Sequence, residues 1–560
     1  NSATRAGGGI EFFAKAGQVA TGTLTNVTIA NNVTGLAPGN GGGVHITGPG
    51  NMTVTGCSVT GNTAAAEGGG LWNGSGTMVV DASIITGNTA SGAPADQGGG
   101  GLFNNGGILT VQNGTWVTDN MATGAAGSGG GILNDIGGQL SVSNSAIVNN
   151  SAVRAGGGIE QNAAGSMLTL MNVALDSNST GPAPGNGGGL HITGPGSATI
   201  TGGTVNGNSA TTEGGGLWNG LGSMTVNGTT INGNTAAGAL SDQGGGGLFN
   251  LKGTLTVQNG TIISNNSATG ASGSGGGIMN DSTATLVVLN SSITGNSATR
   301  AGGGIEFFAK AGQAATGTLT NVSISGNTTG AAPGNGGGVH ITGPGTMSVT
   351  GCTVTNNTAA AEGGGLWNGS GTMTIDDCDI MGNVAHGSVN PAAPNSALDL
   401  QGGGGIFNNL GVVNIVNVIG ATTITGNTAD GATFGSGGGI LSVGGSFNIT
   451  GANISMNETV RAGGGIENGA SMMSITNSTI NNNDCSLGGA IAAATPGNGG
   501  GIHVTGAGTM TVSMCGLDGN AAGNEGGGLW GSGTGTLTVI RSTSSNNSAP
   551  DGGGLFLQAG

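Results

Sequence analysis

Basic residues are scarce in this sequence: only 8 of the 560 residues are lysine or arginine, against 24 aspartates and glutamates. Proteins that bind nucleic acids need a basic surface, so a net charge of −16 argues against that class of partner. Long apolar runs are missing as well, since no stretch approaches the roughly 18 residues of a membrane-spanning helix. We therefore expect no nucleic-acid partner and no membrane span in this segment.

Glycine makes up 130 of the 560 residues, yet the usual glycine-rich classes do not fit. Collagen requires glycine at every third position, and that period is absent. A phosphate-binding loop carries Lys and Ser or Thr after its glycines, and no glycine triplet here does so. Disordered chains combine low hydrophobicity with high charge, whereas here 35% of residues are hydrophobic and only 6% are charged. The composition is compatible with a packed core.

What the sequence does contain is a glycine triplet followed by an apolar residue, as in Gly7-Gly8-Gly9-Ile10, repeated 19 times. Most intervals are about 27–31 residues, a period typical of a solenoid. Short stretches such as Thr254 to Val257 alternate polar and apolar residues between Gly-, Asn- and Ser-rich turns, and no helical period is present. The sequence therefore predicts an all-β fold, a right-handed parallel β-helix with three short strands in each coil.

The triplets fall into five kinds that return in the same order. After the apolar residue the five kinds carry Glu, His, Trp, Phe, and then Leu or Met. Five coils, about 150 residues, thus form a longer repeat. We expect one continuous β-helix over residues 1–560, with super-repeats at 5–153, 154–299, 300–460 and 461–560, the last truncated. Because neither end carries a cap, we also expect a longer protein around this segment.

One asparagine recurs in every complete coil, before a small residue. A stack of inward amides can hydrogen-bond from coil to coil, because an amide both donates and accepts. The sequence therefore predicts an asparagine ladder that runs to Asn547 and begins with Asn32, Asn62, Asn88, Asn120, Asn150, Asn178, Asn208, Asn234, Asn266 and Asn296.

The residue after each Gly-Gly-Gly-apolar run forms a second column. If the apolar residue points inward, its neighbour points outward, so we expect this column on the outer face. Three partners remain open for it: a loop of the same chain, a neighbouring copy, or a sugar ring. Its aromatic members, the candidate contact residues, are Trp72, Phe103, Trp218, Phe249, Trp367, Phe407 and Trp530.

Glu11 and His45 of this column fall on neighbouring coils, and such a pair can act as a general acid and base. The pair recurs every five coils, however, and an enzyme rarely builds the same site four times. One Glu and one His are also too few ligands for a metal. We therefore expect a structural or contact role, no catalytic residue and no metal site.

Two further side-chain sets have competing interpretations. The pairs Glu67/Asp96, Glu213/Asp242 and Glu362/Asp399 form either a solvated acidic stripe or, less favoured because the calcium-roll motif is missing, a Ca²⁺ site.

Cys57, Cys352, Cys378 and Cys515 each lie five residues before a ladder asparagine. Cys352 and Cys378 fall on adjacent coils, so we expect stacked buried thiols, with a disulfide as the alternative.

Thr-x-Thr pairs also recur, as at Thr23-Leu24-Thr25 and Thr254-Leu255-Thr256. Threonine suits the outward face of any strand, and a flat threonine array can alternatively bind ice. The sequence leaves both interpretations open.

The phrase Asn-Ser-Ala-x-x-x-Gly-Gly-Gly-Ile, at Asn150 to Ile159 and Asn296 to Ile305, resembles the right-handed parallel β-helix repeat proteins of bacterial surfaces. It is also similar to the repeats of chlamydial polymorphic outer-membrane proteins. Their Gly-Gly-Ala-Ile hallmark occurs here literally once, from Gly488 to Ile491, and their Phe-x-x-Asn is represented by the shorter Phe103-Asn104. The resemblance implies a secreted or surface-displayed adhesin or fibre and implies no catalytic residues.

From the repeat and this resemblance we expect a non-enzymatic structural segment of an extracellular filament, sheath or giant surface adhesin that self-associates, because open parallel edges invite pairing. A glycan-binding adhesin passenger and a polysaccharide lyase or hydrolase of the β-helix type are the alternatives. An enzyme of that type needs acids and bases clustered in a groove.

Overall fold

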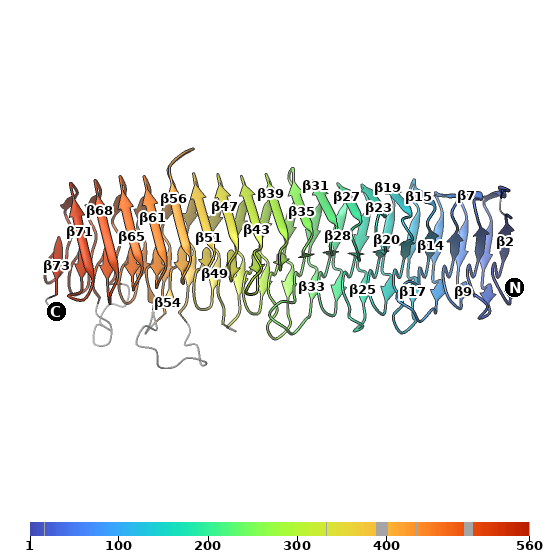
Figure 1. Ribbon diagram of the computed structural model, residues 1–560, viewed down its shortest axis with the longest axis horizontal. Coiled ribbons are helices and arrows are strands. Elements are labelled where there is room, and N and C mark those ends of the chain that lie inside the picture. The colour runs from blue at the N-terminus through green and yellow to red at the C-terminus, as the bar shows by residue number, and fades with distance from the viewer. Residues whose placement is uncertain (16, 332, 388–400, 432–434, 487–496, 559–560) are drawn as a thin grey trace. The chain divides into compact units, whose positions relative to one another are not determined.

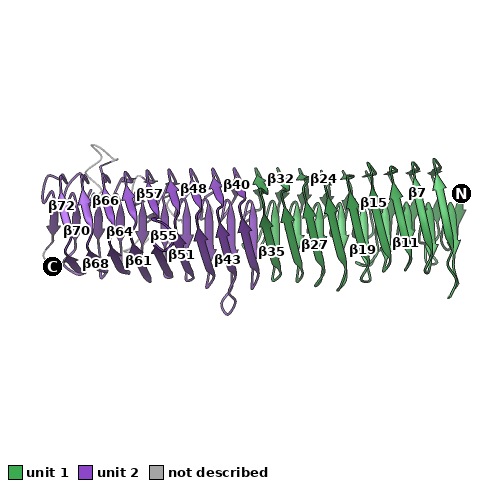
Figure 2. Cartoon of the chain, turned by 90° about the horizontal axis from the view of Figure 1, so that it is seen from above, with its two compact units in different colours: residues 1–270 green, residues 271–560 purple. Residues whose placement is uncertain are grey.

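The computed structural model describes residues 1–15, 17–331, 333–387, 401–431, 435–486 and 497–558. It divides into two compact units, residues 1–270 and 271–560, which are described separately (Figure 2). The regular elements of the described residues are all strands, and within each unit the strands pair in parallel. Each unit is a parallel β-solenoid, which confirms the predicted fold class. The single continuous β-helix and the four super-repeat boundaries stay predictions.

A coil contains four strands rather than three. In the coil that begins at Gly68 they are β10 (Leu71–Asn73), β11 (Thr77–Asp81), β12 (Ile84–Thr86) and β13 (Thr89–Ala90). The fourth strand was missed because two residues are too few to show an alternating pattern. We call the four resulting sheets the glycine sheet, the long sheet, the short sheet and the two-residue sheet, in that order.

In unit 1, strands of the same kind lie side by side in successive coils (Figure 1). The glycine sheet also contains β2 (Ile10–Phe13), β6 (Val44–Thr47), β14 (Leu102–Asn105), β18 (Ile132–Asp135), β22 (Ile159–Gln161), β26 (Leu190–Ile192), β30 (Leu217–Asn219) and β34 (Leu248–Leu251). The long sheet contains β3 (Thr21–Thr25), β7 (Asn51–Thr55), β15 (Ile108–Gln112), β19 (Gln139–Ser143), β23 (Met167–Met171), β27 (Ser197–Thr201), β31 (Ser223–Asn227) and β35 (Thr254–Gln258). The short sheet contains β4 (Thr28–Ala30), β8 (Ser58–Thr60), β16 (Trp116–Thr118), β20 (Ala146–Val148), β24 (Ala174–Asp176), β28 (Thr204–Asn206), β32 (Thr230–Asn232) and β36 (Ile262–Ser264). The two-residue sheet contains β1 (Ser2–Ala3), β5 (Val33–Thr34), β9 (Thr63–Ala64), β17 (Met121–Ala122), β21 (Ser151–Ala152), β25 (Ser179–Thr180), β29 (Ser209–Ala210), β33 (Thr235–Ala236) and β37 (Ser267–Ala268).

Unit 2 repeats the same four kinds of strand. Its glycine sheet contains β38 (Ile278–Asp281), β42 (Ile305–Phe308), β46 (Val339–Thr342), β50 (Leu366–Asn368), β55 (Ile406–Asn408), β60 (Ile440–Ser442), β64 (Ile466–Asn468), β67 (Ile502–Val504), β70 (Leu529–Gly531) and β73 (Leu555–Leu557). Its long sheet contains β39 (Thr285–Leu289), β43 (Thr316–Thr320), β47 (Thr346–Thr350), β51 (Thr372–Asp376), β56 (Val412–Val416), β61 (Ser446–Thr450), β65 (Met472–Thr476), β68 (Thr509–Ser513) and β71 (Thr536–Ile540). Its short sheet contains β40 (Ser292–Thr294), β44 (Ser323–Ser325), β48 (Thr353–Thr355), β52 (Asp379–Met381), β57 (Thr423–Thr425), β62 (Asn453–Ser455), β66 (Thr479–Asn481), β69 (Gly516–Asp518) and β72 (Thr543–Ser545). The remaining two-residue strands are β41 (Ser297–Ala298), β45 (Thr328–Thr329), β49 (Thr358–Ala359), β53 (Val384–Ala385), β54 (Gln401–Gly402), β58 (Thr428–Ala429), β59 (Gly435–Ser436) and β63 (Glu458–Thr459).

The core of each unit consists of inward side chains that stack in register from coil to coil. In the long sheet the second and fourth residues of each strand point inward, as do Met78 and Val80 of β11. Met78 pairs with Met52 in the coil before it and with Leu109 in the coil after it. Burying such a side chain is worth about 1.5–3 kcal/mol, so these columns offset the cost of ordering a glycine-rich backbone.

The asparagine ladder is present, as predicted. Asn120 accepts hydrogen bonds at Oδ1 from the backbone N–H and the side-chain amide of Asn88, at 3.0 and 2.9 Å. Its own Nδ2 donates to Asn150 Oδ1 at 3.0 Å and to the Ile85 carbonyl at 2.9 Å. The Asn120 side chain therefore joins its two neighbouring coils with four hydrogen bonds in a fully buried position.

The glycine triplets serve two purposes, only one of which the sequence suggested. The first glycine turns the chain in the left-handed region, as at Gly129, whose φ is 63°. The second and third are needed for close coil stacking. A Cβ on Gly130 would lie 2.3 Å from the Ser151 carbonyl oxygen, and one on Gly131 would lie 2.6 Å from that of Gly158.

None of the described residues forms a helix long and apolar enough to cross a membrane.

Candidate functional site: a buried ionic and aromatic column

The inner strands of the glycine sheet, such as β10, are buried on both faces. In β10, Leu71 and Asn73 face the core, whereas Trp72 lies on the opposite face and is still only 6% exposed. The chain that enters the glycine triplet covers this opposite face, since a Cβ on Gly68 would lie 2.9 Å from Trp72 Cβ. The residues that follow the Gly-Gly-Gly-apolar runs therefore form a closed column, which we call the covered column.

The covered column begins with an ionic cluster, best formed in β22 and β26. Glu160 is fully buried, and its carboxylate lies 2.8 Å from Nδ1 of His191 and 3.7 Å from the Arg154 guanidinium. Thr193 also donates its hydroxyl to this carboxylate. Arg154 donates in turn to Ser128 Oγ at 3.0 Å. One oxygen of the buried Glu160 carboxylate thus accepts the Thr193 hydroxyl, and the other lies beside the His191 ring.

Aromatic rings continue the same column. The His191 ring stacks on Trp218 with a centroid distance of 4.0 Å and an interplanar angle of 19°. Trp218 stacks in turn on Phe249, with a centroid distance of 6.1 Å and an interplanar angle of 4°. The Trp218 indole N–H donates to Glu213 Oε2 at 3.0 Å, so the polar atom of the buried ring is satisfied by the chain segment that covers it.

The arrangement recurs in both units. In unit 1, His45 stacks on Trp72 at 4.2 Å, and Trp72 forms a buried cluster with Phe103 and Leu133. In unit 2 the corresponding contacts are made by Arg300, Glu306, His340, Trp367, Phe407 and Leu441, and again by Glu467, His503 and Trp530.

Burial shifts several pKa values in the covered column and in the segment that covers it. It raises the pKa of Glu362 to about 7, although the hydrogen bond from the Trp367 indole opposes the shift. Burial also raises the pKa of Glu67. The pKa values of His45 and His340 are lowered by burial, with Glu11 and Glu306 partly restoring them. At neutral pH these two histidines are therefore mostly uncharged.

The covered column lies on the outer face of the glycine sheet and is shielded from solvent. Its candidate contact residues are all at most 7% exposed: Trp72, Phe103, Trp218, Phe249, Trp367, Phe407 and Trp530. Of the three partners left open by the sequence, the covering segment of the same chain is the one observed. The Glu306–His340 pair is sealed in the same way, since His340 is 3% and Glu306 0% exposed, whereas Glu11 of the first pair is 25% exposed.

The structure contains a second amide ladder, which the sequence pattern did not predict. It lies directly after the covered column, where Asn73 Nδ2 donates to Asn104 Oδ1 at 2.7 Å and Asn104 donates likewise to Asn134. All three side chains are fully buried. The repeated phrases Leu-Trp-Asn and Leu-Phe-Asn were its signal, hidden by the variable third position in other coils.

The cysteines are all free and buried. Cys352 and Cys378 occupy equivalent positions on neighbouring coils, just before the paired residues Thr353 and Asp379. The two thiols share a hydrogen bond, and together with burial this bond raises the pKa of the Cys378 thiol. They form stacked thiols, and the alternative disulfide is absent.

The glutamates of the acidic pairs are engaged with the covered column. Glu67, Glu213 and Glu362 are only partly exposed, and each lies in the covering segment. Glu67 and Glu362 accept the indole N–H of Trp72 and Trp367, as Glu213 does that of Trp218. Asp399 lies outside the described residues, and so does the stretch from Gly488 to Ile491. Among the residues that the structure describes, no group of three or more His, Cys, Asp or Glu could hold a metal ion.

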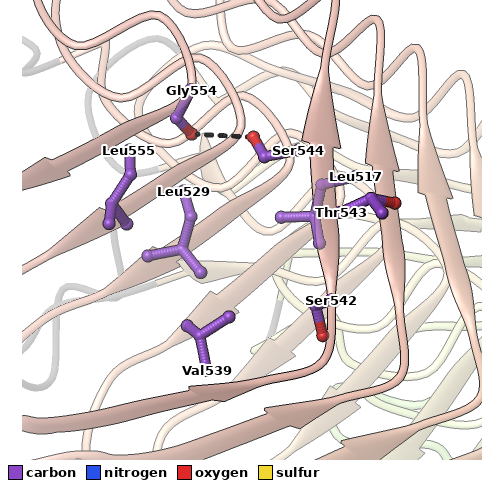
Figure 3. Close-up of a pocket in the computed structure, with 8 residues that line it drawn as sticks. All are labelled: Leu517, Leu529, Val539, Ser542, Thr543, Ser544, Gly554 and Leu555. Carbon is purple, nitrogen blue, oxygen red and sulfur yellow. Dashed lines mark hydrogen bonds between the residues drawn. The ribbon is translucent and has the colours of Figure 1, made fainter.

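Three hollows of the described surface lie elsewhere. One, of about 90 Å³, opens beside the last coil of unit 2, where Leu517, Leu529, Val539 and Leu555 point into a common apolar space (Figure 3). The other two lie over the long sheet and are lined mainly by Thr, Ser and Gly. None of the three is lined by a residue of the covered column.

No family model matches the chain, and neither a curated protein nor a solved structure is significantly similar to it.

Proposed function

We propose that this chain is a structural segment of an extracellular filament, sheath or large surface adhesin, built by coil stacking and self-association. One observation carries the proposal. The Glu, His, Trp and Phe side chains that distinguish four of the five kinds of coil are largely buried and contact one another, and a half-buried arginine such as Arg154 lies beside the glutamate. The five-coil repeat therefore repeats a set of internal contacts between coils. Its glutamate and histidine side chains are used in these contacts rather than presented to a substrate.

The energetic design supports the same conclusion. Each coil is held by parallel backbone pairing, by the asparagine ladder and by the covered column. Side-chain hydrogen bonds of this kind are worth about 0.5–1.5 kcal/mol each, and their number grows with the number of coils. A chain of this kind gains stability by adding coils, which suits a load-bearing segment.

The two alternatives receive less support. A glycan-binding passenger was suggested by Trp72, Trp218 and Trp367, but these rings are stacked and covered. A polysaccharide lyase or hydrolase needs acids and bases in an open groove, whereas three of the four Glu–His pairs are fully buried.

Electron microscopy of the native material, together with sedimentation of the purified chain, tests the proposal. We expect regular fibres or sheets in the native material and concentration-dependent association of the purified chain. Protease treatment of intact cells should remove the protein, with a cytoplasmic enzyme as the protected control. Monomeric particles in both preparations, or protection from the protease, would contradict the proposal.

A further inference from the structure

The outward residues of the long sheet form a hydroxyl-rich surface that the proposed structural role does not require. In unit 1 the middle residue of each strand from β3 to β35 points outward. These residues pair in register in the order Thr23, Thr53, Val79, Thr110, Ser141, Thr169, Thr199, Thr225 and Thr256. Eight of these nine positions carry a hydroxyl group. Strand propensity alone would accept Val, Ile or an aromatic residue equally well.

Unit 2 carries the densest part of this surface, on β39, β43, β47 and β51. Thr285, Thr316, Thr346 and Thr372 form one column, and Val287, Thr318, Ser348 and Thr374 form the column beside it. Six of these residues line a shallow hollow of about 350 Å³. We call these eight residues the hydroxyl face.

The hydroxyl face is a regular two-dimensional grid. Neighbouring parallel strands lie about 4.8 Å apart, and outward residues two apart on one strand are separated by about 6.6 Å. Met347 and Val349, buried beneath the grid, alternate with its outward residues and fix the backbone. The hydroxyl and methyl groups are therefore held at repeating positions before any ligand arrives.

Charge and shape restrict what such a face can bind. The only charged outward side chain of the four strands is Asp376, which is 7% exposed and accepts hydrogen bonds from the backbone N–H groups of Val418 and Ile419. A neutral face offers nothing to a polyanion or a polycation. No outward residue of these strands is aromatic, so a sugar ring finds no platform.

A second protein copy also fits poorly. Interface cores favour aromatic residues, Met and Arg and are depleted in Ser. Dry packing against this face would remove several hydroxyl groups from water, and each one left unpaired costs about 1–3 kcal/mol. The occupant must therefore be neutral, repetitive and able to hydrogen-bond to the hydroxyl groups of the grid, of which those of Thr285 and Thr316 already bond each other at 3.1 Å.

Water in a crystal lattice meets all three conditions. Holding a liquid water molecule at a protein surface costs up to about 2 kcal/mol in entropy, and a molecule that already belongs to ice has lost that freedom. Many weak contacts made simultaneously by a rigid array add up to stable adsorption. We propose that the hydroxyl face adsorbs to ice, with its hydroxyl groups bonding to lattice water and its methyl groups occupying the spaces between.

The test measures inhibition of ice recrystallisation and thermal hysteresis with the purified chain. We expect both activities in the wild type. The double variant Thr318→Lys/Thr374→Lys should lose about tenfold or more of each activity, because its lysine side chains project from the face and keep it from close contact with the ice. The matched control is Thr353→Lys/Thr423→Lys, with the same chemical change on the short-sheet strands β48 and β57. Circular dichroism and thermal unfolding establish that both variants fold.

Three results would overturn the proposal. The first is a wild-type chain with neither activity. The second is an equal loss of activity in the control variant. The third is a change of sedimentation that is confined to the hydroxyl-face variant, which would assign the face to contact with a second copy.

Discussion

At the scale of single residues, Glu362 couples the stability of the segment over Trp367 to pH. Its pKa is about 7 in the folded chain, against 4.5 for an ordinary glutamate. The folded state therefore holds the proton more tightly than the unfolded chain does. The contribution of protonated Glu362 to the free energy of unfolding is about 3 kcal/mol. It is fully present below pH 4.5 and is lost as the pH rises to 7 and above.

This linkage predicts the behaviour of Glu362→Gln, which keeps an oxygen for the Trp367 indole but cannot ionise. Relative to the wild type, the variant should gain up to about 3 kcal/mol in the free energy of unfolding at pH 8 and almost nothing near pH 4.5. Guanidinium unfolding followed by tryptophan fluorescence at both pH values measures the difference. Glu458→Gln, at an exposed position of β63, is the control and should show no such dependence. An equal effect of Glu362→Gln at both pH values would refute the assignment.

Asn120 allows the ladder to be tested in the same way. Asn120→Ala leaves the Asn88 amide, the Ile85 carbonyl and the Asn150 amide oxygen short of partners in a dry interior. We expect a loss of about 3 kcal/mol or more in the free energy of unfolding. Asn51→Ala, at the exposed first position of β7, should stay within about 0.5 kcal/mol of the wild type. Similar values for the two variants would show that the ladder adds little.

Residue patterns predicted the ladder but not the burial of the covered column. The asparagine recurs at one fixed place in every coil, so its column can be read directly. The position of Trp72 on the face opposite Leu71 could also be read from the strand period. Its covering could not, because the segment that contains Glu67 and Gly68 has no alternating pattern and contacts the ring only after the chain turns.

At the scale of the coil, stacking distance decides where glycine is required. A Cβ on Gly464 would lie 2.5 Å from the Gly500 carbonyl oxygen and 2.6 Å from the Asp484 backbone nitrogen, without any positive φ to explain the glycine. Gly464→Ala should therefore push two coils apart. Overpacking of this kind typically costs about 1–3 kcal/mol.

Gly516 provides the comparison, since the nearest atom to a Cβ there is 3.8 Å away, in ordinary contact. Gly516→Ala, within β69, should be neutral or slightly stabilising because it restricts the unfolded chain. Thermal unfolding of the two variants measures the contrast. If Gly464→Ala were as well tolerated as Gly516→Ala, close stacking would not be the reason for the second glycine of the triplet.

The regular period accounts for how much of the coil could be predicted. Alternation in Thr254 to Val257 identifies β35, and the 27–31-residue spacing identifies the solenoid. The two-residue strand, as in Thr89–Ala90, carries no pattern and exists because the neighbouring coils supply its partners. Local sequence thus predicts the longer strands, while the shortest ones depend on stacking.

At the scale of the whole chain, the net charge of −16 opposes the self-association that we propose. Few lysines and arginines are available to neutralise it, and those of the ionic clusters are already engaged with Glu160 and Glu306. Repulsion between like-charged surfaces falls when the carboxylates are protonated or when salt screens them. Association of this chain should therefore depend on pH and ionic strength more strongly than association of a protein with a neutral surface.

We expect the purified chain to associate increasingly as the pH is lowered from 7 toward its isoelectric point of about 4.3. At pH 7 the same increase should follow a rise from 0.1 to 1 M NaCl, over which the screening length falls from about 10 to about 3 Å. Light scattering and sedimentation measure the size, while unchanged circular dichroism and reversal on return to pH 7 and low salt exclude unfolding. A particle size that ignores both pH and salt would mean that surface charge does not limit assembly, and contacts of another kind would have to be sought.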